Sequence, residues 1–356
     1  MDSNKTDRKR IALIGYKFCY GGLEKAMSNI SFLLESSDID VFTIVLDDEV
    51  CYPYGGTLIN LGKNKKISKY LQLKRILRKN QVDYVIDFRY RLNPLMELLF
   101  LLFIYRKFKL IYTVHSSNLE AYFTKSMTIA NFIISQVYKV IAVSEGISDL
   151  IKKNYKITNL STIYNFVDIE DTKEEFINTL PYQYIIGVGR LEKMKQFDKL
   201  IEAYSKTNLN ENNIHLVILG DGEEKEALNK LISHLKIEKY VHLLGFVSQP
   251  YFYIEKALYL VLSSKYEGFG MVLLESLLVR TPVVSFDCKV GPNEIVIDKK
   301  NGILVPDQDF NMLILSMNKM YEDAEFYEYC KKNARKSVLK FSKLEVVKQW
   351  LQLLKI

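Results

Sequence analysis

Residues 181–197 read PYQYIIGVGRLEKMKQF, and the fold class is inferred from what begins again at this point of the chain. The polar residues 168–179 precede it, and its short apolar run, 184–188, passes through a glycine-rich turn into a helical stretch. A run of this kind is typical of a buried strand in a parallel sheet. The alternation of strand and helix fills the chain before residue 168 and restarts here. The sequence therefore repeats one α/β pattern twice.

Two successive sets of strand and helix units predict two doubly wound α/β domains, over residues 1–170 and 171–341. One closed barrel is the alternative, which a break near the middle of the chain disfavours. Helical stretches are expected at 23–34, 67–77 and 145–152. Strands are expected at 11–16, 40–46, 84–88, 110–115 and 139–143 in the first half, and at 184–188, 215–219, 241–244, 258–262 and 282–286 in the second.

Ligands of doubly wound sheets bind outside the carboxyl ends of the strands, so functional residues are sought directly after each strand. Gly21 and Gly22 follow the first strand, where glycines let the backbone approach a phosphate at a helix N-terminus. A plain tight turn is an equal alternative. His115 ends another strand and can contact a substrate hydroxyl or a developing charge, or else serve the structure alone.

In the second half, Arg190 follows the strand at 184–188 and Lys195 begins the next helix. Two cations so placed can converge on one anionic group, and a diphosphate would suit them. The alternative is a pair of solvated surface cations.

Residues 263–275, SSKYEGFGMVLLE, follow a further strand. Glu267 leaves the strand end, the glycines around Phe269 let backbone N–H groups face a ligand, and Glu275 lies about one turn into a helix. The carboxylates would accept hydrogen bonds from sugar hydroxyls while the amides meet a phosphate. Either glutamate taken singly could instead be a helix N-terminal acid.

Composition places the chain among globular proteins. It has 356 residues, of which 48% are apolar and 26% charged, with 7 Pro and 16 Gly. The 4 cysteines are far apart without a C-x-x-C pair, so neither a disulfide framework nor a zinc knuckle is expected, and a reducing cytosol fits. The apolar run 95–105, LMELLFLLFIY, contains Glu97 and is too short to span a membrane, so a buried helix is expected there.

The positive charge is concentrated in one segment. There are 49 Lys and Arg against 42 Asp and Glu, a net charge of +7, and residues 63–79 hold eight basic residues and no acid. This segment predicts an amphipathic helix that binds an anionic membrane surface. In the alternative it is a solvated helix that packs on the sheet through its apolar residues, Ile67, Tyr70, Leu71, Leu73 and Leu77.

Patterns for other chemistries are missing from the sequence. There is no P-loop, no H-E-x-x-H and no dinucleotide-binding G-x-G-x-x-G, which disfavours a nicotinamide oxidoreductase. Asp38 and Asp40 precede their strand, and Asp307 and Asp309 are typical of a helix N-cap, so no metal site is expected.

Several motifs follow one another in the second half: Gly189-Arg190-Leu191 with Lys195, Leu219-Gly-Asp-Gly222, Leu244-Gly-Phe-Val247, Glu267-Gly-Phe-Gly-Met-Val-Leu-Leu-Glu275, Thr281-Pro-Val-Val284 and Asn301-Gly-Ile-Leu-Val-Pro306. Their order and spacing resemble glycosyltransferase family 4, a family of retaining enzymes with the two-domain GT-B architecture. The first half matches more loosely, through Gly21-Gly22-x-Glu24, His115, Val143-Ser144-Glu145 and Tyr164-Asn165-x-Val167-Asp168.

This resemblance implies a role for each matched residue. Arg190 and Lys195 would hold the donor diphosphate, Glu275 the nucleotide ribose, and Val247 would lie beside the base. Gln196 stands where the family often has Gly. Glu267 would hold the donor sugar, together with the amides of Phe269, Gly270, Met271 and Val272.

From the first domain, Gly21 and Gly22 would cover phosphate and His115 would face the donor sugar. The candidate catalytic residues are thus Glu267, His115, Arg190 and Lys195. The C-terminal helix, about 342–356, is expected to pack back onto the first domain.

The implied activity is transfer of a hexose or N-acetylhexosamine (Gal, GalNAc, GlcNAc or Glc) from a UDP-sugar to a glycan acceptor, expected to be lipid-linked. Residues 287–295 look like the version in bacterial enzymes of surface polysaccharide synthesis, which favours UDP-sugars over GDP-mannose. We expect no metal, no cofactor beyond the donor and no nucleic acid, and a location at the cytoplasmic face of the plasma membrane. The alternatives are a nucleotide-sugar epimerase of the same fold and a membrane-binding module with a degenerate sugar site.

Overall fold

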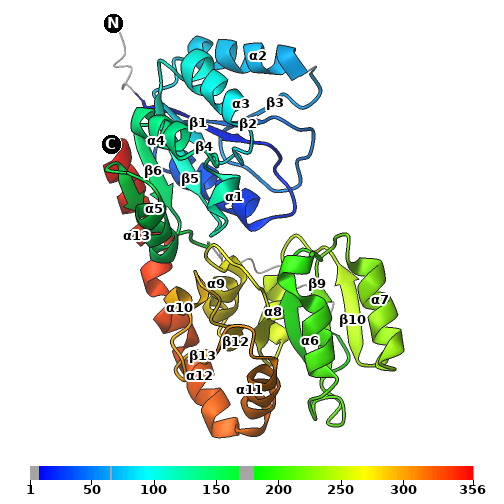
Figure 1. Cartoon of the computed structure of the whole chain (residues 1–356). Helices are drawn as coiled ribbons and strands as arrows, with labels where there is room; N and C mark the ends of the chain where they lie inside the picture. The colour runs from blue at the N-terminus through cyan, green and yellow to red at the C-terminus, as the bar shows by residue number, and fades with distance from the viewer. Residues whose placement is uncertain (1–7, 65, 168–179, 356) are drawn as a thin grey trace, which may run out of the picture. The chain divides into compact units, whose positions relative to one another are not determined.

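The structure, a computed structural model, describes residues 8–64, 66–167 and 180–355 and divides into two compact units (Figure 1). Unit 1 comprises Met1–Phe166 with Lys343–Ile356, and unit 2 comprises Val167–Ser342. The boundary thus falls after Phe166 rather than after residue 170. The polar segment expected to join the domains, 168–179, lies outside the described residues.

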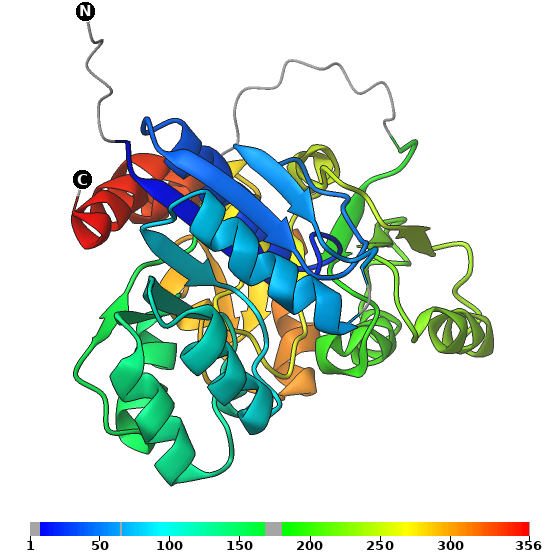
Figure 2. The same cartoon turned by 90° about the horizontal axis from the view of Figure 1, so that it is seen from above.

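Unit 1 is built on a parallel sheet with the strand order β3-β2-β1-β4-β5-β6-β7 (Figure 2). Its strands are β1 (Arg10–Gly15), β2 (Asp40–Val45), β3 (Thr57–Asn60), β4 (Tyr84–Asp87), β5 (Lys109–Val114), β6 (Lys139–Ala142) and β7 (Leu160–Thr162). Its helices are α1 (Gly22–Glu35), α2 (Lys66–Lys79), α3 (Pro94–Leu99), the π-helix η1 (Phe100–Ile104), the 3-10 turn η2 (Leu119–Ala121), α4 (Met127–Gln136), α5 (Glu145–Asn154) and α13 (Lys343–Leu354).

The C-terminal helix α13 belongs to unit 1 although the chain reaches it from unit 2. The Tyr138 hydroxyl donates a hydrogen bond to the Leu353 carbonyl at 3.5 Å, and Val346, Trp350 and Leu354 are buried. One apolar face of this helix is therefore part of the first core.

Unit 2 contains a second parallel sheet with the order β10-β9-β8-β11-β12-β13. Its strands are β8 (Tyr184–Val188), β9 (His215–Leu219), β10 (Val241–Gly245), β11 (Leu260–Leu262), β12 (Val283–Phe286) and β13 (Gly302–Val305). Its helices are η3 (Lys193–Lys195), α6 (Phe197–Tyr204), α7 (Lys225–His234), α8 (Tyr251–Lys256), α9 (Met271–Leu278), α10 (Pro292–Ile295), α11 (Phe310–Glu322), α12 (Ala324–Ser337) and η4 (Leu339–Phe341).

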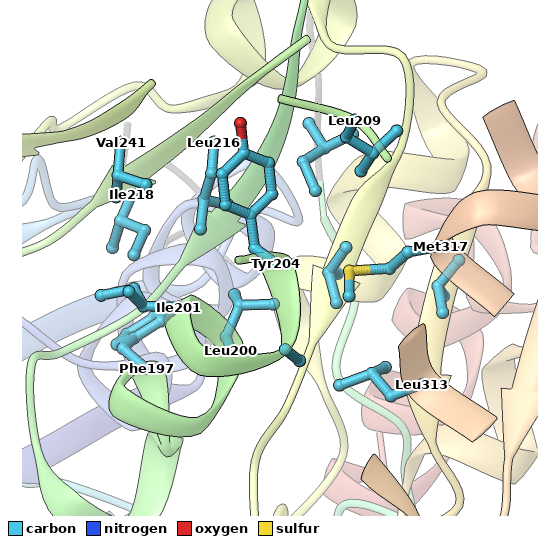
Figure 3. Packing of buried hydrophobic residues seen from close by; sticks show 14 of the residues in the cluster. Phe197, Leu200, Ile201, Tyr204, Leu209, Leu216, Ile218, Val241, Leu313 and Met317 are labelled. Atoms are coloured by element: carbon cyan, nitrogen blue, oxygen red, sulfur yellow. The ribbon is translucent and has the colours of Figure 1, made fainter. Parts of the chain in front are cut away.

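The core of unit 2 forms where α6 and α11 pack on the sheet (Figure 3). Leu200, Ile201 and Ile218 are fully buried there. The two large polar rings that enter it are satisfied by backbone, since Tyr204 donates to the Ile214 carbonyl at 2.6 Å and Tyr259 to the Met317 carbonyl at 2.7 Å. The buried face of α6 fixes where its N-terminus, next to Lys195, lies on the sheet.

Two separate sheets confirm the prediction of two doubly wound domains and exclude the single barrel. Each expected strand is present, although β11 begins at Leu260 rather than at residue 258. Sequence reasoning missed β3, β7 and β13, which are only three or four residues long; β3 and β7 also contain polar residues and are at most partly buried. Asp309 caps α11 as expected, accepting a hydrogen bond from the Met312 amide at 2.9 Å.

The segment 95–105 is helical, and the expectation that it is buried is confirmed for one face only, which includes Phe100 and Tyr105. Leu95, Leu99 and Phe103 are exposed, whereas Glu97 is buried. The reason is an ion pair that the sequence did not disclose: the Arg89 guanidinium lies 3.1 Å from Glu97 Oε2 and is itself buried. None of the helices in the described part of the chain has the length and apolar character that crossing a membrane requires.

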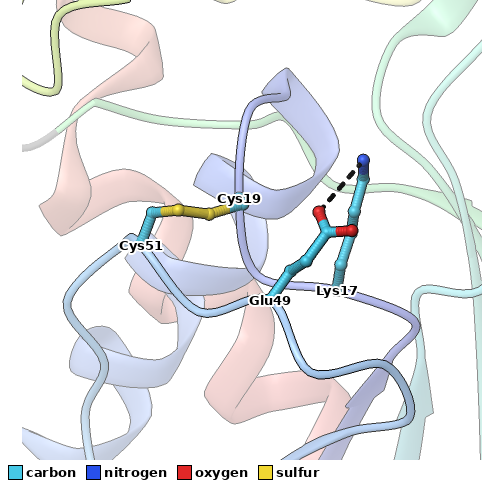
Figure 4. Close-up of a disulfide and its surroundings, with 4 residues drawn as sticks. All are labelled: Lys17, Cys19, Glu49 and Cys51. Atoms are coloured by element: carbon cyan, nitrogen blue, oxygen red, sulfur yellow. Dashed lines mark ion pairs between the residues drawn. A yellow bond between two sulfur atoms is a disulfide. The ribbon is translucent and has the colours of Figure 1, made fainter. Parts of the chain in front are cut away.

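The expectation about cysteines is also wrong, because Cys19 and Cys51 form a disulfide (Figure 4). The loops that follow β1 and β2 pair through their backbones, with the Phe18 amide donating to Glu49 at 2.8 Å and the Cys51 amide to Phe18 at 3.0 Å. This pairing brings together two cysteines that are 32 residues apart. Cys288 and Cys330 are buried free thiols.

Candidate donor-binding site

The candidate site lies where the strand order of unit 2 reverses. β8 pairs with β9 on one side and β11 on the other, so the loops after β8 and β11 leave the same sheet edge in opposite directions. Such a switch point is where doubly wound sheets bind ligands. Arg190 and Lys195 follow β8 and Glu267 follows β11, so the sequence-predicted residues of these two loops meet there.

An ion pair joins the two loops. Lys195 Nζ lies 2.6 Å from Glu267 Oε1, with side chains only 19% and 11% exposed. The backbones are tied as well: Ser263 Oγ donates to the Lys195 carbonyl at 2.9 Å, and the Lys265 amide donates to Met194 at 2.9 Å. Lys195 and Glu267 are therefore held together by both side chain and backbone, and no local sequence pattern indicates that they form a pair.

The backbone conformation of Gln196 shows why the family often has glycine at this position. It has a φ of +53° and starts α6 in the left-handed conformation, which Gly adopts without steric cost. Here the side chain compensates, because the amides of Gln196 and Gln308 exchange hydrogen bonds of 2.9 and 3.0 Å. The helix start keeps its backbone geometry despite the substitution.

Arg190 is placed differently from Lys195. Its guanidinium lies 2.9 Å from Glu192 Oε1 and is 41% exposed. A methyl group added at Gly189 would lie 3.4 Å from Cε of Lys195, so the stem of Lys195 runs alongside the residue that precedes Arg190. The two cations thus leave adjacent backbone, each held by its own carboxylate.

The backbone of the loop before α9 is open to close approach by a ligand. Gly270 is the N-cap of α9 with a φ of +97°, and the first turn carries no acid, so the positive end of the helix is not neutralised from within. Gly291 supports the loop from below with a φ of +100°, because any Cβ there would lie 2.6 Å from the Phe269 carbonyl oxygen. The amides of Met271 and Val272 open the helix at this point.

Glu275 is buried on α9 and faces the start of α8. Burial, together with the nearby carboxylate of Glu275, raises the pKa of Tyr251 to about 12. Val247 lies between β10 and α8, in the loop that leads to Tyr251. Tyr251 is a neighbour of Glu275 that sequence reasoning missed, since an isolated aromatic residue gives no signal.

Cys288 is a second missed neighbour. Its thiol is fully buried, and burial together with the charge of Glu267 raises its pKa to about 12. A thiol that stays protonated is a poor nucleophile. Cys288 therefore forms part of the wall beside Glu267 and does not act as a reactive group.

In unit 1, Gly21 is the N-cap of α1 and Gly22 its first residue. A Cβ at Gly21 would overlap only the carboxylate of Glu24, the mobile end of a side chain, and Gly21 has an extended backbone with a φ of −155°, so packing alone does not demand glycine there. The disulfide of Cys19 fastens the same loop. These glycines do lie after the carboxyl end of β1, as expected, beside the strand switch between β1 and β4.

His115 follows β5, and both of its ring nitrogens are buried without a hydrogen-bond partner among the residues that the structure describes. Burial and the charge of Arg91 lower its pKa to about 3, so the ring is neutral at physiological pH. It packs against Phe88 with ring centroids 5.5 Å apart. A neutral imidazole can donate or accept a hydrogen bond but does not supply a positive charge.

Next to His115 lies a buried ionic cluster that sequence reasoning missed. Arg89 donates to Asp87 Oδ2 at 2.8 Å and to Glu97 Oε2 at 3.1 Å, while Arg91 donates to the backbone carbonyls of Tyr122 and Thr113 at 3.0 Å. The sequence pattern that could have indicated this cluster is Asp-x-Arg-x-Arg at the end of β4, where three charged residues stand in place of the usual apolar ones.

Comparison with known proteins finds a family model for each half of the chain. The family model described as Glycosyltransferase Family 4 matches residues 20–171, and the one described as Glycosyl transferases group 1 matches residues 168–337. A relative from Campylobacter jejuni is 28% identical over 97% of this chain and 99% of its own. It is named N-acetylgalactosamine-N,N'-diacetylbacillosaminyl-diphospho-undecaprenol 4-alpha-N-acetylgalactosaminyltransferase.

A second relative, the poly(ribitol-phosphate) alpha-N-acetylglucosaminyltransferase of Staphylococcus aureus, is 29% identical over 70% of this chain and 50% of its own. Among solved structures, S. aureus TarM with UDP superposes with a TM-score of 0.80 at 17% identity, over 98% of this chain and 100% of that one. Anabaena HepE with UDP and glucose gives 0.77 at 17% identity, over 98% and 100%. The chain therefore belongs to the GT-B glycosyltransferases of glycosyltransferase family 4.

Proposed function

We propose that this glycosyltransferase is a retaining enzyme that moves a hexose or N-acetylhexosamine from a UDP-sugar to a lipid-linked glycan acceptor. The observation that carries the proposal is the pair Lys195–Glu267 at the strand switch point, beside the open N-terminus of α9. The cation and the amides at the helix N-terminus can bind the diphosphate, and the carboxylate can accept hydrogen bonds from the sugar. The UDP donor is supported by the solved neighbours that carry UDP, and the acceptor by the name of the Campylobacter relative.

Each of the predicted site residues in unit 2 has a distinct role in the proposed donor site. Arg190 and Lys195 bind the diphosphate from one side and the amides of Met271 and Val272 from the other. Glu267 keeps one oxygen on Lys195, which leaves the second for donor-sugar hydroxyls. Glu275, close to Tyr251, binds the ribose. Val247 lies beside the base.

Transfer in this arrangement needs no protein nucleophile. The bond between the sugar C1 and the diphosphate oxygen breaks, and the acceptor oxygen bonds to C1 from the same face. The acceptor proton passes to the departing diphosphate, whose growing charge Arg190 and Lys195 stabilise. This course retains the anomeric configuration and uses side-chain cations in the role that a divalent metal ion has elsewhere.

The roles of Gly21, Gly22 and His115 remain predictions from the family resemblance, because these residues belong to unit 1. We further propose that the enzyme acts at the cytoplasmic face of the membrane. Exposed cations on α2 support this location: Arg75, Arg78 and Lys79 face solvent.

A donor screen tests the proposed function. Titration calorimetry and UDP release are measured across UDP- and GDP-sugars, with a diphospho-undecaprenol-linked glycan as acceptor, and the anomeric configuration of the product is read by NMR. We expect a UDP-sugar to be preferred and its α-anomer to be kept. Isomerised UDP-sugar without a transfer product would indicate an epimerase, and an inverted product would contradict the same-face mechanism.

A further inference from the structure

Unit 1 presents an apolar helical surface to solvent, which we name the leucine ridge. It consists of Leu92, Leu95, Leu99, Leu102 and Phe103, and these side chains are 74%, 70%, 48%, 47% and 60% exposed. The last four follow a spacing of four, three and one residues along α3 and η1, so they share one face. Contiguous exposed apolar residues of this kind mark an interaction surface.

The inward face of the same helical segment is buried and carries one charge among apolar side chains, since Glu97 is buried together with Phe100, Leu101 and Tyr105. Glu97 is buried with Arg89, and the Arg89 guanidinium stacks on the Phe100 ring at 3.8 Å from its centroid. Turning the helix to bury the leucines would break this ion pair and leave a buried charge without its partner, which is strongly unfavourable. The outward orientation of the ridge is therefore fixed by the core.

The neighbouring helix α2 adds positive charge but no free apolar face. Leu73 and Leu77 are fully buried, so the surface expected to enter a membrane already packs on the sheet. The expectation that Leu71 shares that face is wrong, since Leu71 is exposed. It lines an open hollow together with the cations Lys74, Arg75, Arg78 and Lys79.

The cationic and apolar surfaces are adjacent. α2 packs against η1, where the rings of Tyr70 and Phe100 meet edge to face at 5.1 Å, and Figure 1 shows α2 beside α3. Arg106 and Lys107 follow Tyr105, the C-cap of η1, and are exposed. Cations therefore flank the ridge along two of its borders.

We propose that the leucine ridge inserts into an anionic lipid leaflet while the cations of α2 pair with lipid phosphates. The inference deepens the proposed use of a lipid-linked acceptor and rests on it. Charge complementarity selects this occupant, because acyl chains accept the leucines and anionic headgroups accept the flanking cations. A second copy of the chain fits poorly, since an isologous contact would bring the same cations face to face.

Vesicle flotation of the full chain tests the inference. The vesicles are phosphatidylcholine alone or with about one third phosphatidylglycerol, at low and high salt. Wild type should float with the anionic vesicles, and Leu95→Gln/Leu99→Gln should lower its partition by at least about tenfold. Arg75→Gln/Arg78→Gln should lower binding chiefly at low salt, where headgroup attraction is strongest.

The matched control is Leu315→Gln/Leu344→Gln, which removes leucines that are 60% and 72% exposed on α11 and α13. It should float like wild type. Calorimetry with UDP on the same samples separates the two proposals. If wild type binds UDP but does not bind anionic vesicles, the inference about the leucine ridge is wrong and the proposed donor site is unaffected. If wild type does not bind UDP, the proposed function is contradicted. A dimer in sedimentation that only the ridge variant dissociates would show an interface between copies, and the inference would be wrong.

Discussion

Removing the ammonium group of Lys195 tests the proposed site at its centre. Lys195→Ala leaves the carboxylate of Glu267, which is 11% exposed, without the cation that lies 2.6 Å away. It also takes a positive charge from the place where charge grows on the leaving diphosphate. Loss of one preorganised electrostatic contact costs about 2.7 kcal/mol, or about 100-fold in turnover. Because much of this contact is made only as the donor bond breaks, kcat should fall more than UDP affinity.

Steady-state UDP release gives kcat and calorimetry gives UDP affinity for each variant. The matched control is Lys199→Ala, on helix α6 just after Lys195, whose 2.9 Å pair with Glu202 has side chains that are 43% and 40% exposed and contributes little. The double variant Lys195→Ala/Glu267→Gln should lose less than the sum of the single losses, because the residues are in contact. Turnover of Lys195→Ala within a few-fold of wild type would refute the assignment.

Three further outcomes are expected. Activity should survive EDTA, since Arg190 and Lys195 provide the charge that a metal ion would supply; a loss that Mg²⁺ or Mn²⁺ restores would contradict this. Glu275→Gln should weaken UDP binding by about tenfold in calorimetry, because one charge-assisted hydrogen bond to ribose is lost; unchanged affinity would place the ribose elsewhere. His115, with its folded pKa lowered to about 3 against about 6.5 when unfolded, should make stability fall as pH drops below 6.5, by at most about 2 kcal/mol at pH 5. In denaturant unfolding, the free energy of unfolding of His115→Gln should depend less on pH than that of wild type. The same pH dependence in both proteins would show that His115 is not buried as a neutral ring.

The class of fold and the chemistry available at the strand ends follow from local patterns in the sequence. Strands such as β8 and β9 are runs of buried apolar residues, and this local pattern is read directly from the chain. The same holds for Arg190, Lys195 and Glu267 as residues that follow strands. Local periodicity decides which element forms, so a residue's place relative to its own strand needs no knowledge of the rest of the fold.

The tertiary structure alone decided which of these residues meet. Lys195 reaches Glu267, 72 positions away, because β8 and β11 are neighbours at the switch of strand order, and no local pattern encodes that order. Cys19 finds Cys51 for the same reason, since β1 pairs with β2. The leucine ridge faces outward because the opposite face of the segment is held in the core, where Phe100 and Tyr105 are buried and Glu97 pairs with the buried Arg89.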